Sequence, residues 1–369
     1  MRFNNHFKSF ACAILAISTA ATVRAQSIPK YSNEFLNIGV GARSLAMAKS
    51  VTASTSDVYA GYWNPAALVE IEDNLQVGYM HSGYWSGVAN YDYGGLAFKL
   101  KNQGALGLSM VRFGIDNIPN TFDLIRNGQI DYNRVSSFSA VDYAFIMSYA
   151  QKTTTTGLSF GGNAKVVHRK AGQFGKSWGF GIDASMRYKS ENNWYFSIMA
   201  KDITSTFNAW RYSFTDAEKE ILTQTNNDIP ENSLEITLPS FNIGLAKQMD
   251  FSDNFGLLAE INTLVTTDGQ RNTLVSADPI SLDPTLGLEL NYKKMIYLRG
   301  GMGNIQKITH DDLSKSWNIE PNTGLGLKLG NIHLDYALST VGKTATGNYT
   351  HVFSVKFVIN KTEKEQKTE

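Results

Sequence analysis

The sequence predicts an all-β protein, a transmembrane antiparallel β-barrel of about fourteen strands. Three observations predict this fold. Apolar and polar residues alternate in short segments through residues 75–359, the connections between these segments alternate between short and long, and no long apolar run follows the first 25 residues. Because a strand sends successive side chains to opposite faces, each segment has one apolar and one polar face. A closed barrel in lipid places the apolar faces outside.

The first 25 residues have the pattern of a secretory signal peptide. Arg2 and Lys8 supply a positive end, residues 10–23 are mostly apolar, and Ala25 ends a small-x-small cleavage pattern. The only cysteine, Cys12, lies in this leader. We therefore expect cleavage near Ala25 and a mature chain with no disulfide, thiolate metal site or cysteine nucleophile.

Residues 26–74 are predicted to form an N-terminal plug or hatch segment. The segment is rich in glycine and alanine and lacks the rhythm of a barrel strand. Small residues allow close packing, which suits a plug folded into the barrel mouth. Glycines at inward positions of the expected strands would leave room for this plug, or they would only relieve strand curvature. These glycines are Gly179, Gly181, Gly287, Gly324 and Gly326.

The barrel is predicted to span residues 75–359. Ser177 to Tyr188 shows the alternation best, with Trp178, Phe180 and Ile182 on one side. The other expected strands are Leu75–Tyr84, Tyr91–Leu100, Ala105–Phe113, Ala140–Tyr149, Leu158–His168, Trp194–Ile203, Ser240–Gln248, Phe255–Leu264, Thr285–Tyr292, Met295–Met302, Asn322–Leu329, Ile332–Leu338 and Val352–Ile359.

The parity of the connections sets the expected orientation. Connections after even-numbered strands are mostly short, and those after odd-numbered strands are mostly long. The long connections are expected at residues 114–139, 169–176, 204–239, 265–284, 303–321 and 339–351. Outer-membrane barrels have short periplasmic turns and long extracellular loops, so both termini should lie in the periplasm. The inward faces should carry balanced charges, because a charge facing hydrocarbon is costly. The expected inward charges are Asp142, Lys165, Asp183, Arg187, Glu260, Glu289, Arg299, Lys328, Asp335 and Lys356.

The ends and the overall composition exclude several functions. Residues 360–369 are all polar and should form a disordered periplasmic tail. The net charge of +1 argues against nucleic acid as a partner. The histidines are scattered, and no nucleophile elbow or nucleotide-binding loop occurs, so we expect no catalytic residues, no metal, no cofactor and no enzyme activity.

Two long connections are rich in apolar and aromatic residues. In residues 204–239, Thr215-x-x-Glu218 is a capping-box pattern and predicts a short helix. Such loops either fold over the pore as a lid or form a partner-binding surface. The candidate partner-binding residues in these two connections are Ile118, Phe122, Leu124, Phe207, Trp210, Tyr212 and Phe214.

The N-terminal block resembles the PorV/PorQ family of Bacteroidetes. The resemblance rests on Asn37-Ile38-Gly39-Val40-Gly41-Ala42-Arg43, then Met47 and Asp57, then Tyr62-Trp63-Asn64-Pro65-Ala66-Ala67-Leu68, and it continues through residues 230–235. The triplet Asn64-Pro65-Ala66 also resembles the wider FadL group. Family members often have glycine where this chain has Ala67 and Ala48. The plug-motif residues are Gly39, Gly41, Arg43, Asn64, Pro65 and Ala66.

The resemblance implies a FadL-like barrel with a plug, in the outer membrane of a Gram-negative cell. It implies a non-enzymatic role in the type IX secretion system, in which extracellular loops dock the translocon barrel or the C-terminal signal domain of secreted cargo. Some family members are linked to surface attachment or gliding motility. The alternative is a FadL-like transporter of hydrophobic small molecules. Such a route needs an apolar lining, and the charged inward faces favour the secretion hypothesis.

Overall fold

A computed structural model describes residues 32–71, 74–126, 128–310, 313–340 and 349–360. The signal-peptide prediction for residues 1–25 and nearly all of the tail lie outside these residues. No helix in the described part of the chain is both long enough and apolar enough to cross a membrane.

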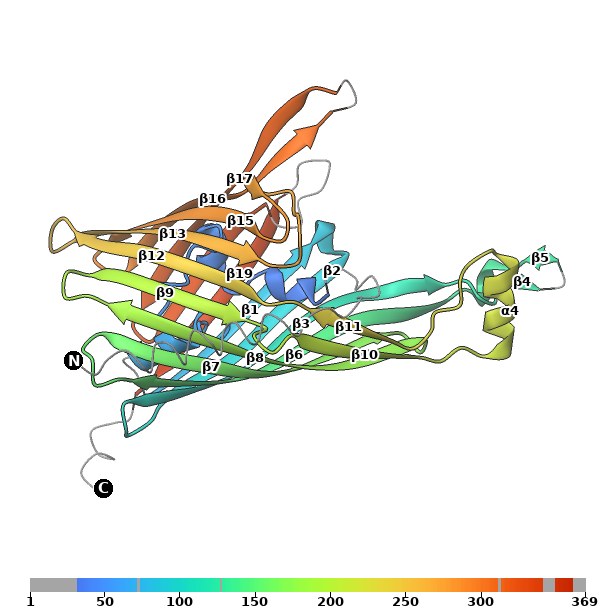
Figure 1. Ribbon diagram of the computed structural model, residues 1–369, viewed down its shortest axis with the longest axis horizontal. Coiled ribbons are helices and arrows are strands. Elements are labelled where there is room, and N and C mark those ends of the chain that lie inside the picture. The colour runs from blue at the N-terminus through green and yellow to red at the C-terminus, as the bar shows by residue number, and fades with distance from the viewer. Residues whose placement is uncertain (1–31, 72–73, 127, 311–312, 341–348, 361–369) are drawn as a thin grey trace, which may run out of the picture. The chain divides into compact units, whose positions relative to one another are not determined.

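Fourteen strands of the described chain close into an antiparallel β-barrel, as predicted (Figure 1). Each strand pairs with the next, and the last pairs with the first, so the main wall has no free edge. In order around the wall they are β1 (Leu75–Tyr84), β2 (Ala89–Lys99), β3 (Gly104–Asn120), β6 (Ser136–Lys152), β7 (Leu158–Ala171), β8 (Gly175–Lys189), β9 (Trp194–Lys201), β12 (Ser240–Asp250), β13 (Phe255–Thr266), β15 (Ser281–Tyr292), β16 (Ile296–Thr309), β17 (Lys315–Leu329), β18 (Ile332–Ser339) and β19 (Thr350–Ile359).

Several predicted loops are strands that continue past the membrane. β3 and β6 are 17 residues each, and β7 and β8 meet in a tight turn, so the long connections expected at 114–139 and 169–176 were partly wrong. Backbone pairing needs no lipid, so the strands keep their hydrogen bonds beyond the bilayer. Residues 303–321 likewise belong mainly to the paired ends of β16 and β17.

Residues 204–239 also contain regular structure instead of a single loop. They form β10 (Thr206–Tyr212), α4 (Asp216–Gln224) and β11 (Ser233–Thr237). The helix begins where the capping box predicted it. We call the projecting ends of β3, β6, β10 and β11, together with α4, β4 (Ile125–Arg126), β5 (Gln129–Ile130) and η4 (Tyr132–Arg134), the long arm (Figure 1). The remaining short elements are η3 (Trp85–Gly87) and β14 (Val275–Ser276).

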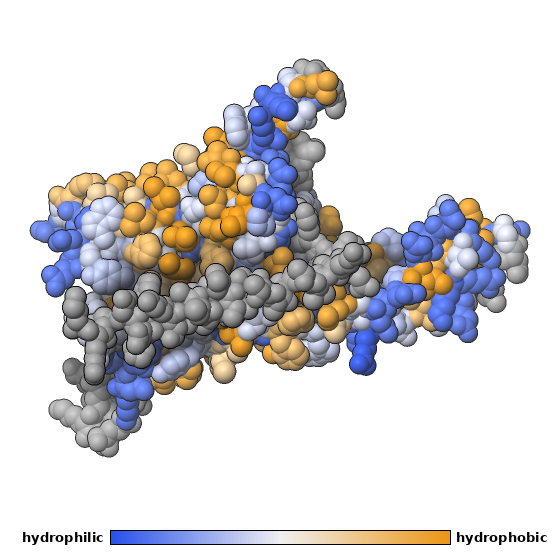
Figure 2. Space-filling model, in the orientation of Figure 1, coloured by the Kyte–Doolittle hydropathy of each residue, from blue (hydrophilic) through white to orange (hydrophobic). Residues whose placement is uncertain are grey.

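The outer face of the barrel is apolar, and Figure 2 shows this surface in orange beside the hydrophilic long arm. On β8 the outward side chains run from Trp178 to Tyr188. Ten residues cover about 33 Å along a strand, and a tilt of about 40° reduces this to about 25 Å of membrane depth, the usual apolar height of such a barrel. Trp178 and Tyr188 therefore mark the two membrane interfaces.

The N-terminal segment lies inside the barrel as η1 (Glu34–Asn37), α2 (Ala42–Ala46), α3 (Ala60–Trp63) and η2 (Pro65–Glu70). The helix α2 packs against β16 to β19, and η2 packs against β3, β6, β7 and β8. We refer to residues 32–71 as the plug segment.

Glycines in the wall explain part of the close packing between the wall and the plug segment. A Cβ on Gly287 would touch Met47, and a Cβ on Gly324 would touch Ala46, so these two glycines leave room for the plug segment. The other three glycines singled out in the sequence face side chains of the wall itself. Gly161 and Gly301, which the sequence reasoning did not single out, face the backbone of the plug segment still more closely.

Candidate functional site

The plug-motif residues seat the plug segment against the wall. Gly39 and Gly41 have positive φ, which glycine adopts without strain, and they turn the chain into α2. The Asn64 side-chain amide donates to the Thr52 carbonyl (2.8 Å), which closes the turn before η2. Pro65 opens η2, and the Ala66 amide donates to Ser185 on β8 (2.9 Å). The motif therefore has a packing role.

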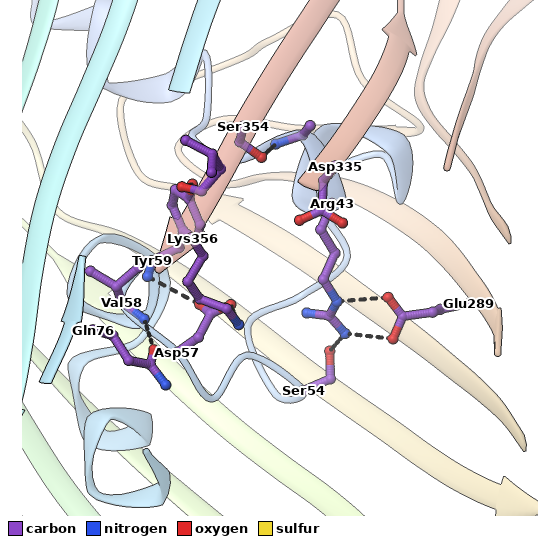
Figure 3. A network of polar contacts seen from close by, with 12 residues as sticks. Arg43, Ser54, Asp57, Val58, Tyr59, Gln76, Glu289, Asp335, Ser354 and Lys356 are labelled. Carbon is purple, nitrogen blue, oxygen red and sulfur yellow. Dashed lines mark hydrogen bonds and ion pairs between the residues drawn. The ribbon is translucent and has the colours of Figure 1, made fainter. Parts of the chain in front are cut away.

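Arg43 ties the plug segment to the wall through an ion network (Figure 3). Its guanidinium donates to both carboxylate oxygens of Glu289 on β15, at 2.8 and 3.3 Å. Glu289 also accepts from Arg299 on β16 (2.5 Å), and Arg299 in turn donates to Asp335 on β18 (2.6 Å). Two cations and two anions thus balance each other beneath the helix α2, and all the wall members belong to the inward charges expected from the sequence.

Two more contacts hold the next part of the plug segment. The Lys356 ammonium pairs with Asp57 (3.0 Å), and the Val58 amide donates to Gln76 (3.0 Å), as Figure 3 shows. Glu260 accepts from the amides of Ala53 (2.8 Å) and Ser54 (3.0 Å). Buried carboxylates need partners of this kind. The arrangement holds a segment in place, and it contains no nucleophile paired with a base.

The described residues contain no cluster of potential metal ligands. That the protein has no metal and no cofactor remains a prediction from the sequence. The charged residues of the lumen bind each other and the plug segment, so their role is to hold the plug segment in position.

A cavity lies at each end of the plug segment. The outer one has a volume of about 410 Å³ and is lined by Leu45, Lys49, Trp85, Asp283 and Glu320, among others. The inner one, about 370 Å³, is lined mainly by polar residues of the ion network and of the short turns. The plug segment thus separates an outer vestibule that contains Trp85 from a strongly polar inner vestibule.

One connection between wall strands also contacts the start of the plug segment. Arg271, between β13 and β15, donates to Asp268 (2.9 Å) and to Glu34 of η1 (3.1 Å). Hydrogen bonds to Asp268 raise the pKa of Arg271 above its ordinary value. This guanidinium stays charged at every physiological pH and fixes η1 beneath the rim.

The wall has a break at the middle of its apolar band. Ala184 pairs with Ala200, and Phe180 pairs with Phe207, which leaves residues 181–183 of β8 opposite the six residues 201–206. The strand that begins as β9 therefore bulges at 202–205 before it resumes as β10. We call residues 202–205 the wall break.

Buried ions stabilise the wall break. Lys165 on β7 pairs with Asp183 (2.7 Å) and with Asp202 (2.6 Å). The Asp202 amide donates to the Asp183 carboxylate (2.8 Å), and the Thr206 hydroxyl donates to Asp202. Irregular backbone at membrane depth requires such internal partners. The sequence offered one unused signal, the polar run Asp202, Thr204 and Ser205 at the end of an expected strand.

An apolar depression on the outer surface leads to the wall break. It has a volume of about 1160 Å³ and extends across β1, β2, β3, β6, β7 and β8. Leu108, Phe145 and Phe180 are among its outward-facing residues, and Thr204 and Ser205 lie at its end. A lipid-facing hollow and an irregular piece of wall therefore meet.

The candidate partner-binding residues do not form one surface. Phe122 and Phe214 each contact Phe174 (5.2 and 5.7 Å between ring centres), so they belong to the internal aromatic core of the long arm. Trp210 is nearly buried and stacks on Tyr212. The remaining residues are Phe207, which faces lipid on β10, and the half-buried Ile118 and Leu124 of the long arm.

The capping box of α4 allows a test of what stabilises this helix in the long arm. Thr215 accepts from the Glu218 amide (3.3 Å), and Glu218 accepts from the Thr215 amide (2.7 Å). Thr215→Ala should destabilise the helix by about 1 kcal/mol, seen as faster hydrogen exchange of amides 219–224. Thr223→Ala, inside the helix, is the control and should not speed exchange, since alanine is the better helix former. Equal protection in the two variants would show that packing alone holds α4.

The fold and the site define a transmembrane β-barrel whose lumen is filled by its own N-terminal segment. The chain aligns with the solved CymD monoaromatic hydrocarbon channel at a TM-score of 0.54, with 12% identity over 88% of this chain and 98% of that chain. It aligns with the toluene transporter TodX of P. putida at 0.52, with 12% identity over 88% and 99%. A FadL homologue of Pseudomonas aeruginosa aligns at 0.48, with 13% identity over 86% and 97%.

No protein-family model and no curated sequence matches the chain. At 12% identity the solved structures show a shared fold, here a FadL-like barrel. The comparisons give no support to the resemblance to the PorV/PorQ family or to its type IX secretion role.

Proposed function

We propose that the protein is a channel in a bacterial outer membrane, that it takes up hydrophobic small molecules, and that these leave sideways through the wall break. The observation that carries the proposal is the break itself, which lies at mid-depth and adjoins an apolar hollow. The shared fold with a monoaromatic hydrocarbon channel and a toluene transporter supports the same class of solute.

The charges in the lumen favour a lateral exit over an axial one. A hydrocarbon moving straight through the lumen would have to pass the Arg43–Glu289–Arg299 network and the polar inner vestibule. Desolvating these ions against an apolar solute is unfavourable. A molecule that leaves at the wall break enters the apolar depression, where transfer from water to hydrocarbon is favourable.

The wall break can be tested by locking it. Ile182 and Ile203 face outward, and the Ile203 amide donates to the Ile182 carbonyl (3.0 Å). We expect that Ile182→Cys with Ile203→Cys, joined by a short thiol cross-linker, reduces toluene uptake into a Gram-negative host to the level of cells that lack the protein. The sequence has one other cysteine, Cys12 in the expected leader, so the cross-linker should react only at the two introduced cysteines once the leader is removed.

The matched control joins two strands where the wall is regular. Leu290 and Leu298 are directly paired on β15 and β16 and also face outward. Leu290→Cys with Leu298→Cys, cross-linked in the same way, should leave uptake unchanged. Full uptake with the wall break locked would rule out the lateral route.

A second candidate function is protein docking, because the tip of the long arm exposes apolar side chains. Ile125, Ile130 and Tyr132 are 65, 60 and 76% exposed. Isolated apolar residues are common on surfaces, but three at one tip form a contact patch. The partner that the PorV/PorQ resemblance implies is a type IX translocon or secreted cargo.

A pull-down from outer membranes would test the docking function. If it holds, Ile130→Ser with Tyr132→Ser should lose a protein partner that the unaltered chain retains, while toluene uptake stays the same. Recovery of the same proteins with both chains would remove the long-arm tip as a docking site.

A further inference from the structure

Three cations stand side by side on the outer face of the wall. Lys170 on β7 lies directly opposite Lys176 on β8, and Lys176 lies directly opposite Arg211 on β10. All three side chains are exposed. None of them forms an ion pair with another residue in the described part of the chain. We call these three residues the cationic row.

Like charges at directly opposite positions of a sheet repel each other, since their Cβ atoms are only about 5 Å apart. Within the lumen the chain pairs its cations with carboxylates, as it does for Lys165 and Arg299. The cationic row lacks such partners, so an anion from outside the chain would relieve the repulsion.

The cationic row lies at the level of the lipid headgroups. The next outward residues toward the membrane are His168 and Trp178, which are directly paired and whose rings stack at 4.1 Å. Trp178 marks the extracellular edge of the apolar band. Aromatic rings prefer this interfacial position, so the cations one step beyond it face the headgroup layer.

Below Trp178 the surface suits acyl chains. Phe180 and Phe207 are directly paired, 63 and 46% exposed, and both line the apolar depression. A free anion in water would gain nothing from this apolar surface. A lipid with a charged head would contact both parts.

We propose that this face of the barrel binds a phosphorylated lipid of the outer leaflet, with its phosphate on the cationic row and an acyl chain along Trp178, Phe180 and Phe207. The lipid class is that of lipid A, a phosphate-bearing glucosamine with several acyl chains. Charge-assisted hydrogen bonds from lysine and arginine to phosphate are the recognising contacts. The proposal is independent of the proposed channel function.

The test measures lipid retention by the full-length protein. The protein is placed in nanodiscs of phosphatidylcholine that contain a small fraction of diphosphorylated lipid A, and bound lipid is counted by native mass spectrometry. The variant is Lys170→Gln with Lys176→Gln and Arg211→Gln. Each basic residue near an anionic lipid contributes about fivefold in affinity, so we expect roughly a hundredfold weaker retention.

Matched controls separate position from charge. Lys247→Gln with Lys293→Gln and Lys294→Gln removes the same charge at the opposite rim and should leave retention unchanged. Lys170→Arg with Lys176→Arg keeps the charge and should retain the lipid. Dephosphorylated lipid A should bind the unaltered protein as weakly as the phosphorylated lipid binds the glutamine variant.

Three results would overturn the proposal: unchanged retention by the glutamine variant, equal loss in the opposite-rim control, or displacement of the lipid by an equal concentration of inorganic phosphate. The last result would indicate a site for a free anion. If the triple variant does not give the heat-modifiable gel migration of a folded barrel, Arg211→Gln alone carries the test, with about a fivefold loss expected.

Discussion

Replacing Glu289 by alanine is expected to loosen the plug segment and to destabilise the folded protein by about 3–5 kcal/mol, the usual cost of removing one partner of a buried ion pair. Glu289 is the only described side chain that bonds both Arg43 of the plug segment and Arg299 of the wall. Its loss leaves two guanidiniums facing each other without the carboxylate between them. The destabilisation should appear as a lower temperature at which heating changes the migration of the barrel in a gel.

The same variant should conduct ions. With Arg43 released, the path between the outer and inner vestibules is no longer held shut, and planar-bilayer recordings should show larger or more frequent openings. Lys219→Ala is the control, because it removes an ion pair with Asp216 on the exposed helix α4, and exposed pairs contribute about 0–1 kcal/mol. Equal stability and conductance in both variants would mean that the Arg43 contact does not hold the plug segment.

The barrel was predictable because lipid imposes a simple rule on each strand. Phe180 and Ile182 face outward while Asp183 and Arg187 face inward and are buried, as the alternation in β8 predicted. The rule concerns only the alternation of successive residues along one strand. It can therefore be recognised without knowing which strands lie next to each other. It stops at the membrane surface, so the paired ends of β3 and β6 were taken for loops.

The site could not be predicted, because its contacts join distant parts of the chain. Arg43 and Glu289 are 246 positions apart, and no local pattern sets which inward carboxylate meets which cation. The wall break arises from a mismatch in length between β8 and its partner strand. Such a mismatch exists only in the paired sheet, and the polar run Asp202, Thr204 and Ser205 indicates only that an expected strand ends there.

The motif residues also explain why the resemblance could not choose a function. Gly39 and Gly41 turn the chain, and Pro65 and Ala66 seat η2 on the wall. A barrel of this fold needs such packing whether it docks a protein or passes a hydrocarbon. Residues that hold a plug segment therefore identify the architecture, whereas the two proposed functions rest on the wall break and on the long-arm tip.

Replacing Gly161 by valine is expected to displace the plug segment through a steric clash, without removing any charge. A Cβ at Gly161 would lie 2.3 Å from the Ala66 nitrogen and 2.5 Å from the Pro65 carbonyl carbon. These are backbone atoms, so no side chain can rotate away. Overpacking costs about 1–3 kcal/mol of folding stability. Here η2 must also move away from the wall, which breaks the hydrogen bonds of Ala66 with Ser185 and Ser159.

The measurements are hydrogen exchange of residues 60–71 and conductance in planar bilayers, and both should rise. Gly94→Val is the matched control, since a Cβ at Gly94 on the outward face of β2 meets nothing within 4 Å. Because the two changes add the same side chain to the same kind of strand, any difference between them reports the contact with the plug segment. If the Gly161 variant exchanges no faster than the Gly94 variant, then η2 is not held against β7 by close packing.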